Sequence, residues 1–362
     1  MSVYQEEYTI PDLIDDTIQS LKFFPSKEKN ILSSGGFDSK LRFFDINYQL
    51  YNSSQNAKFE SKLVNIIENP SPILSLSFGN NLSIFTGCSD GSINFIDLNK
   101  NSLYTINKHN SGCKEVVYIN DYNLLISGGW DGNLKLIDLR NGNVVSNYQF
   151  DNKIYSVSYN KNLLVVGMSQ FVLAYFDLTY LQKGLFRPEI VFKSHLNEHI
   201  RKVVVFSDGK KFAEASIEGR VAIKNVNLNQ APKLDLEFKK YSLKGEEDFA
   251  FKAHREQIND DLINYQINDM CVNPIDDTLC TVGGDSAYRI WDINKKSKIT
   301  ERPKELLDKI PLTSCDINQN GNILAIASGY DWSLGANSAS NYPRPKISLR
   351  YLKDKERYYS SF

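Results

Sequence analysis

The stretch Ser127–Asp138, which reads SGGWDGNLKLID, contains the pattern from which the fold can be predicted. A cluster of small residues precedes Asp131, and a second acid, Asp138, follows seven residues later. Aspartate followed by glycine favours a tight turn, because the carboxylate bonds to nearby backbone amides and glycine accepts a positive φ. After the turn, Leu134 and Leu136 occupy alternate positions, as in a half-buried strand. The stretch therefore predicts a β-hairpin.

The same frame occurs elsewhere in the chain. The other copies are Ser33–Asp45 (SSGGFDSKLRFFD), Thr86–Asp97 (TGCSDGSINFID) and Thr281–Asp292 (TVGGDSAYRIWD). The first acids of the copies are Asp38, Asp90, Asp131 and Asp285. One acid at one fixed place per repeat indicates a turn and hydrogen-bonding role, and argues against a metal or catalytic ring. The closing acids Asp45, Asp97, Asp138 and Asp177 are separated by 52, 41 and 39 residues, close to the length of about 40 to 50 residues that is typical of a propeller blade.

We therefore predict an all-β fold, a seven-bladed WD40 β-propeller that occupies residues 1–362 as one domain. The later blades are expected to close at Phe176–Asp177, Ala222–Val226, Trp291–Asp292 and, for the seventh, Ile347–Leu352. An N-terminal strand, Tyr4–Ile10, is expected to complete the outer edge of the last blade. Two segments break the period: a polar insertion at 229–248 and a last-blade loop at 331–345. Long surface loops of this kind are often functional.

Charge and cysteine content limit the classes of function. Lys plus Arg number 42 against 43 acids, so the overall charge gives no support for nucleic-acid binding. A local patch at Lys295–Lys298 with Arg302 leaves a weak RNA contact open. The five cysteines are scattered without a CxxC pair, which favours buried thiols in a reducing compartment. Residues 1–10 lack the apolar core of a signal peptide, and no apolar run approaches the ~20 residues of a membrane span, so we expect a nuclear or cytoplasmic protein.

No motif predicts catalysis, a cofactor or a metal. His195–His199 reads HLNEH, which matches the HxxEH pattern of zinc peptidases. That pattern needs a helix to bring both imidazoles onto one face, whereas the flanking residues here favour strands. We expect His109 and His254 to be structural, since each precedes the first strand of a blade. The chain is therefore predicted not to be an enzyme.

Three further segments carry a resemblance to a known family. They are Ser216–Ile223 (SIEGRVAI), Phe249–Arg255 (FAFKAHR) and Asn320–Ser333 (NGNILAIASGYDWS). By these segments the chain resembles the Rae1/Gle2 family of WD-repeat mRNA export factors and its close relative, the spindle-checkpoint protein Bub3. The run Tyr330–Ser333 favours the export branch, whereas Phe37 stands where the family tends to have tryptophan.

The resemblance implies a non-catalytic scaffold at the nuclear pore that docks a short acidic segment of a nucleoporin, with paired glutamates, on one propeller face. The alternative is a checkpoint adaptor of the Bub3 type that binds kinase or kinetochore motifs. Either way we expect a monomeric propeller within a heteromeric complex, without a membrane contact. An export factor would be found in the nucleus and at the nuclear envelope, and would shuttle to the cytoplasm.

The resemblance also implies which residues bind. Arg220 matches the family arginine that pairs with the glutamates, and Arg201 matches a second surface arginine. Arginine suits this role because it makes bidentate, charge-assisted bonds to carboxylates. Positions of a neighbouring aromatic and basic patch are filled by Phe251, Trp291, Lys296 and Lys298. Alternatively, Trp291 could simply pack within its blade. The lysines could simply belong to a solvated surface. Trp332 is added because a loop tryptophan is not a core residue by default.

Overall fold

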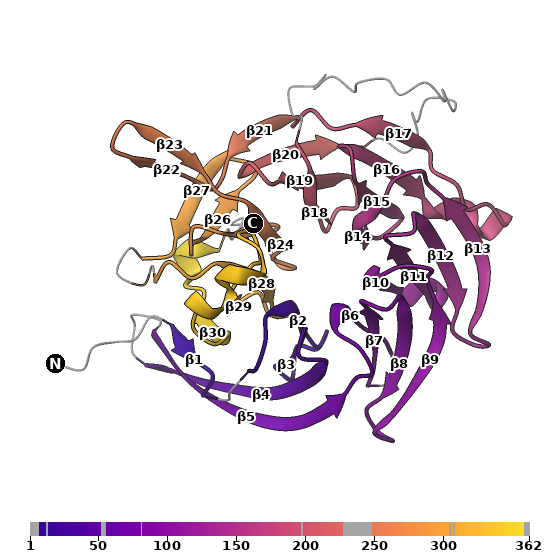
Figure 1. Cartoon of the computed structure of the whole chain (residues 1–362), viewed down its shortest axis with the longest axis horizontal. Coiled ribbons are helices and arrows are strands. Elements are labelled where there is room, and N and C mark those ends of the chain that lie inside the picture. The colour runs from indigo at the N-terminus through magenta and orange to yellow at the C-terminus, as the bar shows by residue number, and fades with distance from the viewer. Residues whose placement is uncertain are drawn as a thin grey trace. The chain divides into compact units, whose positions relative to one another are not determined.

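The computed structural model describes residues 7–11, 14–51, 56–80, 82–196, 198–226, 248–303, 306 and 308–357. These residues form seven four-stranded sheets, each one blade, and a separate two-stranded hairpin (Figure 1). The predicted all-β class and the seven blades are confirmed. The chain divides into two compact units, one of Leu74–Ile267 and one of Met1–Ile73 with Asn268–Phe362.

The unit Leu74–Ile267 contains blades two to five, each a meander of antiparallel neighbours in chain order. Blade two consists of β6 (Ile73–Phe78), β7 (Ser83–Cys88), β8 (Ser92–Asp97) and β9 (Ser102–Lys108). Blade three consists of β10 (Cys113–Ile119), β11 (Leu124–Gly129), β12 (Asn133–Asp138) and β13 (Asn143–Gln149). Blade four consists of β14 (Ile154–Asn160), β15 (Leu163–Met168), β16 (Val172–Asp177) and β17 (Ile190–Lys193). Blade five consists of β18 (Ile200–Val205), β19 (Lys211–Ser216), β20 (Arg220–Asn225) and β21 (Phe249–Lys252). The extra hairpin is β22 (Arg255–Ile258) with β23 (Asp261–Asn264).

The second unit contains blades one, six and seven. Blade one consists of β2 (Ile18–Phe23), β3 (Ile31–Gly36), β4 (Lys40–Tyr51) and β5 (Asn56–Glu68). Blade six consists of β24 (Ile267–Val272), β25 (Leu279–Gly283), β26 (Tyr288–Asp292) and β27 (Ser297–Glu301). Blade seven consists of β28 (Leu312–Ile317), β29 (Ile323–Ser328), β30 (Lys346–Tyr351) and β1 (Tyr8–Thr9). Short 3-10 helices are η1 (Asn120–Tyr122), η2 (Leu178–Lys183), η5 (Ala336–Asn341) and η6 (Asp354–Glu356).

Blade seven takes its outermost strand from the other end of the chain. Tyr8 lies opposite Leu349 and Thr9 opposite Ser348, so β1 pairs antiparallel to β30. The segment 331–345 contains η5 and connects β29 to β30. The polar insertion 229–248 lies outside the described residues except for Asp248, whose carboxylate accepts a hydrogen bond from the amide of Asn225.

Polar side chains on the innermost strands connect each blade to the next within a unit. A serine or acid on one inner strand accepts a hydrogen bond from a backbone amide of the following inner strand. In the first unit the acceptor–amide pairs are Ser75–Val116 (3.1 Å), Ser77–Tyr118 (3.0 Å), Ser156–Val203 (3.2 Å) and Ser158–Val205 (3.0 Å). In the second they are Asp269–Cys315 (3.2 Å), Ser314–Leu21 (3.1 Å) and Asp316–Phe23 (2.8 Å). These bonds fix the stagger between blades, because backbone amides buried there need an acceptor.

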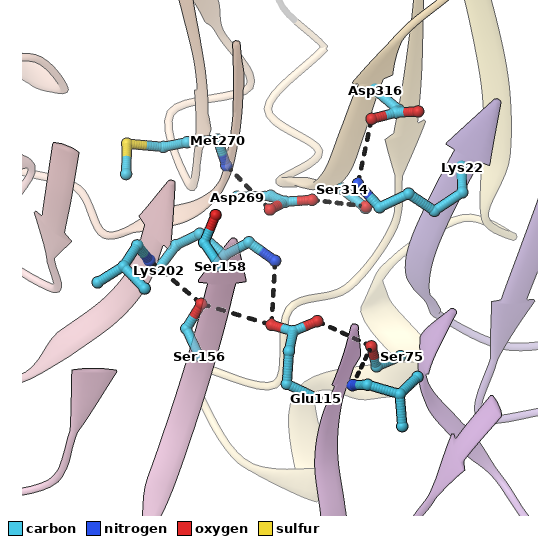
Figure 2. Close-up of polar contacts among 12 residues, drawn as sticks. Lys22, Ser75, Glu115, Ser156, Ser158, Lys202, Asp269, Met270, Ser314 and Asp316 are labelled. Carbon is cyan, nitrogen blue, oxygen red and sulfur yellow. Dashed lines mark hydrogen bonds and ion pairs between the residues drawn. The ribbon is translucent and has the colours of Figure 1, made fainter. Parts of the chain in front are cut away.

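Glu115 on β10 is the centre of this polar belt in the unit Leu74–Ile267 (Figure 2). Its carboxylate accepts from Ser75 on β6 at 2.8 Å and from Lys202 on β18 at 3.2 Å. A longer contact of 3.4 Å reaches Ser156 on β14. A single buried carboxylate therefore joins blades two to five. Figure 2 also shows the ion pair of Lys22 with Asp316, at 3.1 Å, which joins blade one to blade seven.

Candidate functional site

Each of the first six blades has a turn between its second and third strands in which the residue after the position of the repeat acid is left-handed. These residues are Ser39, Gly91, Gly132, Phe171, Gly219 and Ser286. We call the end of a blade at which this turn lies its turn end. The predicted repeat acids lie in these turns, and each accepts the amide two residues further on. The pairs are Asp38–Lys40 (3.1 Å), Asp90–Ser92 (3.1 Å), Asp131–Asn133 (3.1 Å) and Asp285–Ala287 (3.2 Å).

The repeat acids also bind side chains of their own unit. Asp38 pairs with Arg42 at 2.6 Å, and Asp285 pairs with Arg289 at 2.6 Å. Asp90 pairs with Lys108 at 3.3 Å. Their oxygens are thus occupied by the turn and its neighbours, so the acids hold the blades together rather than forming a binding site.

In blade three the partner of the repeat acid is a buried histidine. His109 Nδ1 lies 3.0 Å from Asp131 Oδ1, and Nε2 lies 2.9 Å from Ser127 Oγ. Burial lowers the pKa of His109, against the opposite effect of the Asp131 charge. Burial tends to raise the pKa of Asp131, but the Asn110 and Asn133 amides and His109 bring it below its usual value. Since the carboxylate only accepts, Nδ1 donates to Asp131 and Nε2 accepts from Ser127.

Blade five differs, because two cations at its turn end, Arg220 and Lys252, form no ion pair with any described residue. Arg220 begins β20 and lies directly opposite Lys252 of β21. Like charges directly opposite each other destabilise a sheet. Among the described residues neither side chain forms an ion pair, and the buried Nε of the half-buried Arg220 has no acceptor. A negative charge placed near these two side chains would relieve the repulsion between them.

The other two predicted residues of this blade lie at the same end. Arg201 is exposed and lies at a β-bulge, between the residues Ile200 and Lys202 that pair with β19. The same bulge occurs on the innermost strands of blades one, three, four and seven, so it is a feature of the repeat. Phe251 is half-buried on β21 and stacks on Phe249, with ring centroids 6.0 Å apart. We call Arg201, Arg220, Phe251 and Lys252 the blade-five site.

The structure places the predicted residues of blade six at the end opposite to its turn end. Trp291 lies near the end of β26 and donates its indole N–H to Thr281 Oγ1 at 3.1 Å. Lys296 lies in the β26–β27 turn, and Lys298 pairs with Glu301 at 2.8 Å. Their partner-binding roles stay predictions. Arg302, named with the possible RNA patch, is buried and pairs with Glu7 at 3.0 Å.

Trp332 lies in the loop between β29 and β30, is 38% exposed and has a left-handed backbone, φ 63°. Its ring contacts Phe37 of blade one at a centroid distance of 6.0 Å and Tyr330 at 5.4 Å. The tryptophan is therefore an aromatic surface residue within its own unit. Its role in partner binding also stays a prediction.

The histidine and cysteine residues give no catalytic arrangement in the described part of the chain. His195 and His199 lie in the connection between β17 and β18, which contains no helix there. Sequence reasoning missed one cluster: the sulfurs of Cys271, Cys280 and Cys315 lie within 4.8 Å of one another, the one metal-type grouping in the described residues. They come from three strands, so no short spacing reveals them. Burial raises the pKa of Cys315 well above its usual value, so these residues pack as neutral thiols in a hydrophobic cluster.

The blades and their turn-end hydrogen bonds define the class of the protein: a WD40 β-propeller. The family model of the anaphase-promoting complex subunit 4 WD40 domain matches residues 76–162. The described part of the chain has no helix long and apolar enough to cross a membrane.

The chain is also similar over most of its length to individual proteins. The chain is 29% identical over 359 residues to "mRNA export factor rae-1" of Caenorhabditis elegans, covering 95% of this chain and 88% of that protein. It is 29% identical over 349 residues to "Protein Rae1" of Drosophila melanogaster, covering 94% and 92%. It is 29% identical over 337 residues to "Spindle assembly checkpoint protein bub3" of Schizosaccharomyces pombe, covering 92% and 96%. The predicted resemblance to the Rae1/Gle2 export factors and to Bub3 is confirmed.

Proposed function

We propose that this propeller is a non-catalytic scaffold in mRNA export, which docks an extended acidic segment of a nucleoporin on the blade-five site. The observation that carries the proposal is the pair of opposed cations, Arg220 and Lys252, that lack ion-pair partners among the described residues. Arg201 adds a third positive charge at the same turn end. Two adjacent glutamates would match these charges, and arginine would bind them by paired, charge-assisted hydrogen bonds.

The export role is supported by the name of the Caenorhabditis elegans relative, "mRNA export factor rae-1". The Drosophila melanogaster relative carries the same name, Rae1. The place of action would then be the nucleus and the nuclear pore, with shuttling to the cytoplasm. The propeller would act as one copy in a larger complex, because its ligand is a segment of another protein.

The direct test is the affinity for a synthetic peptide with paired glutamates, measured by fluorescence polarisation. Arg220→Glu places a negative charge against the peptide and should weaken binding by about 2–5 kcal/mol, that is, roughly 30-fold or more. The matched control is Lys210→Glu, an exposed lysine at the other end of the same blade, which should leave affinity unchanged. Equal affinities of wild type and Arg220→Glu would overturn the proposal.

The second candidate is a checkpoint adaptor, which the similarity to the Schizosaccharomyces pombe bub3 protein favours. Purified protein and its Arg220→Glu variant would be used to capture partners from a lysate, with identification by mass spectrometry. A nucleoporin that the variant loses supports the export role. Checkpoint kinases or kinetochore proteins captured in its place support the adaptor role.

A further inference from the structure

The turn between β15 and β16 of blade four has an unusual backbone. Gln170 and Phe171 are both left-handed, with φ of 58° and 63°. At the position of Phe171, blades two, three and five have Gly91, Gly132 and Gly219. A bulky residue in this conformation costs about 1–3 kcal/mol, and such strain tends to be kept at functional sites.

In blades two and five the backbone leaves no space for a side chain at the position equivalent to Phe171. A Cβ added to Gly91 would lie 2.4 Å from the His109 carbonyl oxygen, and one added to Gly219 would lie 2.3 Å from that of His254. In blade two the Gly91 carbonyl accepts a hydrogen bond from the His109 amide at 2.9 Å. In blade four the Phe171 carbonyl accepts the equivalent bond, from the Ser194 amide at 2.7 Å. The connection from β17 to β18 therefore makes room for a side chain while keeping the hydrogen bond of the repeat.

The ring of Phe171 contacts a residue of the connection that leads into blade five. It lies 5.3 Å from the ring of His199, which is exposed and precedes β18. The His199 carbonyl accepts from the Ile217 amide at 3.1 Å, in the turn that leads to Arg220. The aromatic pair is thus continuous with the turn end of blade five, where His199 is two residues from Arg201.

We propose that Phe171 and His199 form a second subsite of the blade-five site, which takes an apolar or aromatic side chain of the same acidic segment. This inference rests on the proposed function. The occupant is an acidic segment because the adjoining surface is cationic, with Arg201, Arg220 and Lys252. Aromatic side chains next to arginine are the usual composition of binding hot spots.

The decisive variant is Phe171→Gly, because it removes the ring and the backbone strain together. If the ring serves binding, this variant should be at least as stable as the wild type in urea unfolding, yet bind at least about tenfold more weakly. If the ring serves only packing, stability should fall and affinity should not. Ser286→Gly is the matched control, since it relieves the same conformation in blade six and should leave affinity unchanged.

Two peptides separate this proposal from the one it rests on. Both contain paired glutamates, and one has leucine or phenylalanine beside them where the other has alanine. Wild type should prefer the first peptide, whereas Phe171→Gly and His199→Ala should bind both with equal affinity; Phe171→Tyr should keep the preference. Binding that Arg220→Glu abolishes but Phe171→Gly and His199→Ala leave unchanged would overturn the aromatic subsite alone. Binding insensitive to Arg220→Glu would overturn both proposals.

Discussion

The turn ends of blades three and five have the same backbone but opposite electrostatics. In blade three, the acid of the turn accepts hydrogen bonds from His109 and from the Asn110 and Asn133 amides. In blade five, Glu218 is exposed, and the described residues give it no such network. The opposed cations Arg220 and Lys252 add charge that no described residue neutralises by an ion pair. A repeat position whose polar groups are all bonded within the blade supports the fold, whereas one that keeps unmatched charge is available to a partner.

The largest expected effect is the loss of the blade-three network. Asp131→Ala leaves His109 buried without its acceptor and the two amides without theirs. The free energy of unfolding should fall by about 3–5 kcal/mol, because one partner of a buried pair is removed. Urea unfolding measures this change. Affinity for the acidic peptide should stay within about twofold of wild type, because distant sites act independently; a loss of binding in the folded variant would contradict the division between the two blades.

The second effect is a pH dependence that originates in blade five. Burial raises the pKa of Glu214 to about 7 from 4.5, against the opposite influence of Ser194 and Lys224. The native state therefore binds more protons than the unfolded state between these pH values, and stability should fall as the pH rises through this window. The full contribution is about 3 kcal/mol.

Glu214→Gln tests this because glutamine does not titrate. Urea unfolding at a series of pH values should show a decline in stability for the wild type and a flatter profile for the variant. Parallel profiles for the two proteins would show that the decline comes from other groups.

The smallest effect concerns the opposed cations themselves. Lys252→Ala should raise the free energy of unfolding by a few tenths of a kcal/mol, since it removes a like-charge pair across two strands. The same variant should weaken binding of the acidic peptide by severalfold, because a charge close to the ligand is lost. Stability and affinity would thus change in opposite directions. A variant less stable than wild type would indicate that Lys252 supports the sheet.

The fold could be predicted from sequence because its signal is local and repeated. Asp131 and its counterparts mark hairpins within about a dozen residues, and the spacing of the hairpins gives the blades. Arg220 could be named from the segment SIEGRVAI, which lies within a single turn and strand. Phe171 could not, because Gln170 replaces the turn acid in blade four and hides the repeat.

Other parts of the site depend on distances that the sequence does not contain. Glu115 and Lys202 are 87 residues apart in the chain, so their contact follows only from the blade arrangement. Conversely, Trp291 lies only six residues after the turn acid Asp285, but the direction of β26 places it at the other end of blade six. A short distance between two residues in the sequence does not show that they lie at the same end of a blade.

The bond from Glu115 to Lys202 also bears on how the protein is made. A ribosome adds about 5–20 residues per second, so Lys202 is synthesised on the order of 4–17 s after Glu115. Blades three and four are synthesised during that interval, and until it ends the Glu115 carboxylate has no Lys202 ammonium group to pair with. Burying the Glu115 carboxylate without a cation would be unfavourable. We therefore expect the nascent blades to stay unpacked around it, and blades two to five to pack around Glu115 only after Lys202 has been synthesised.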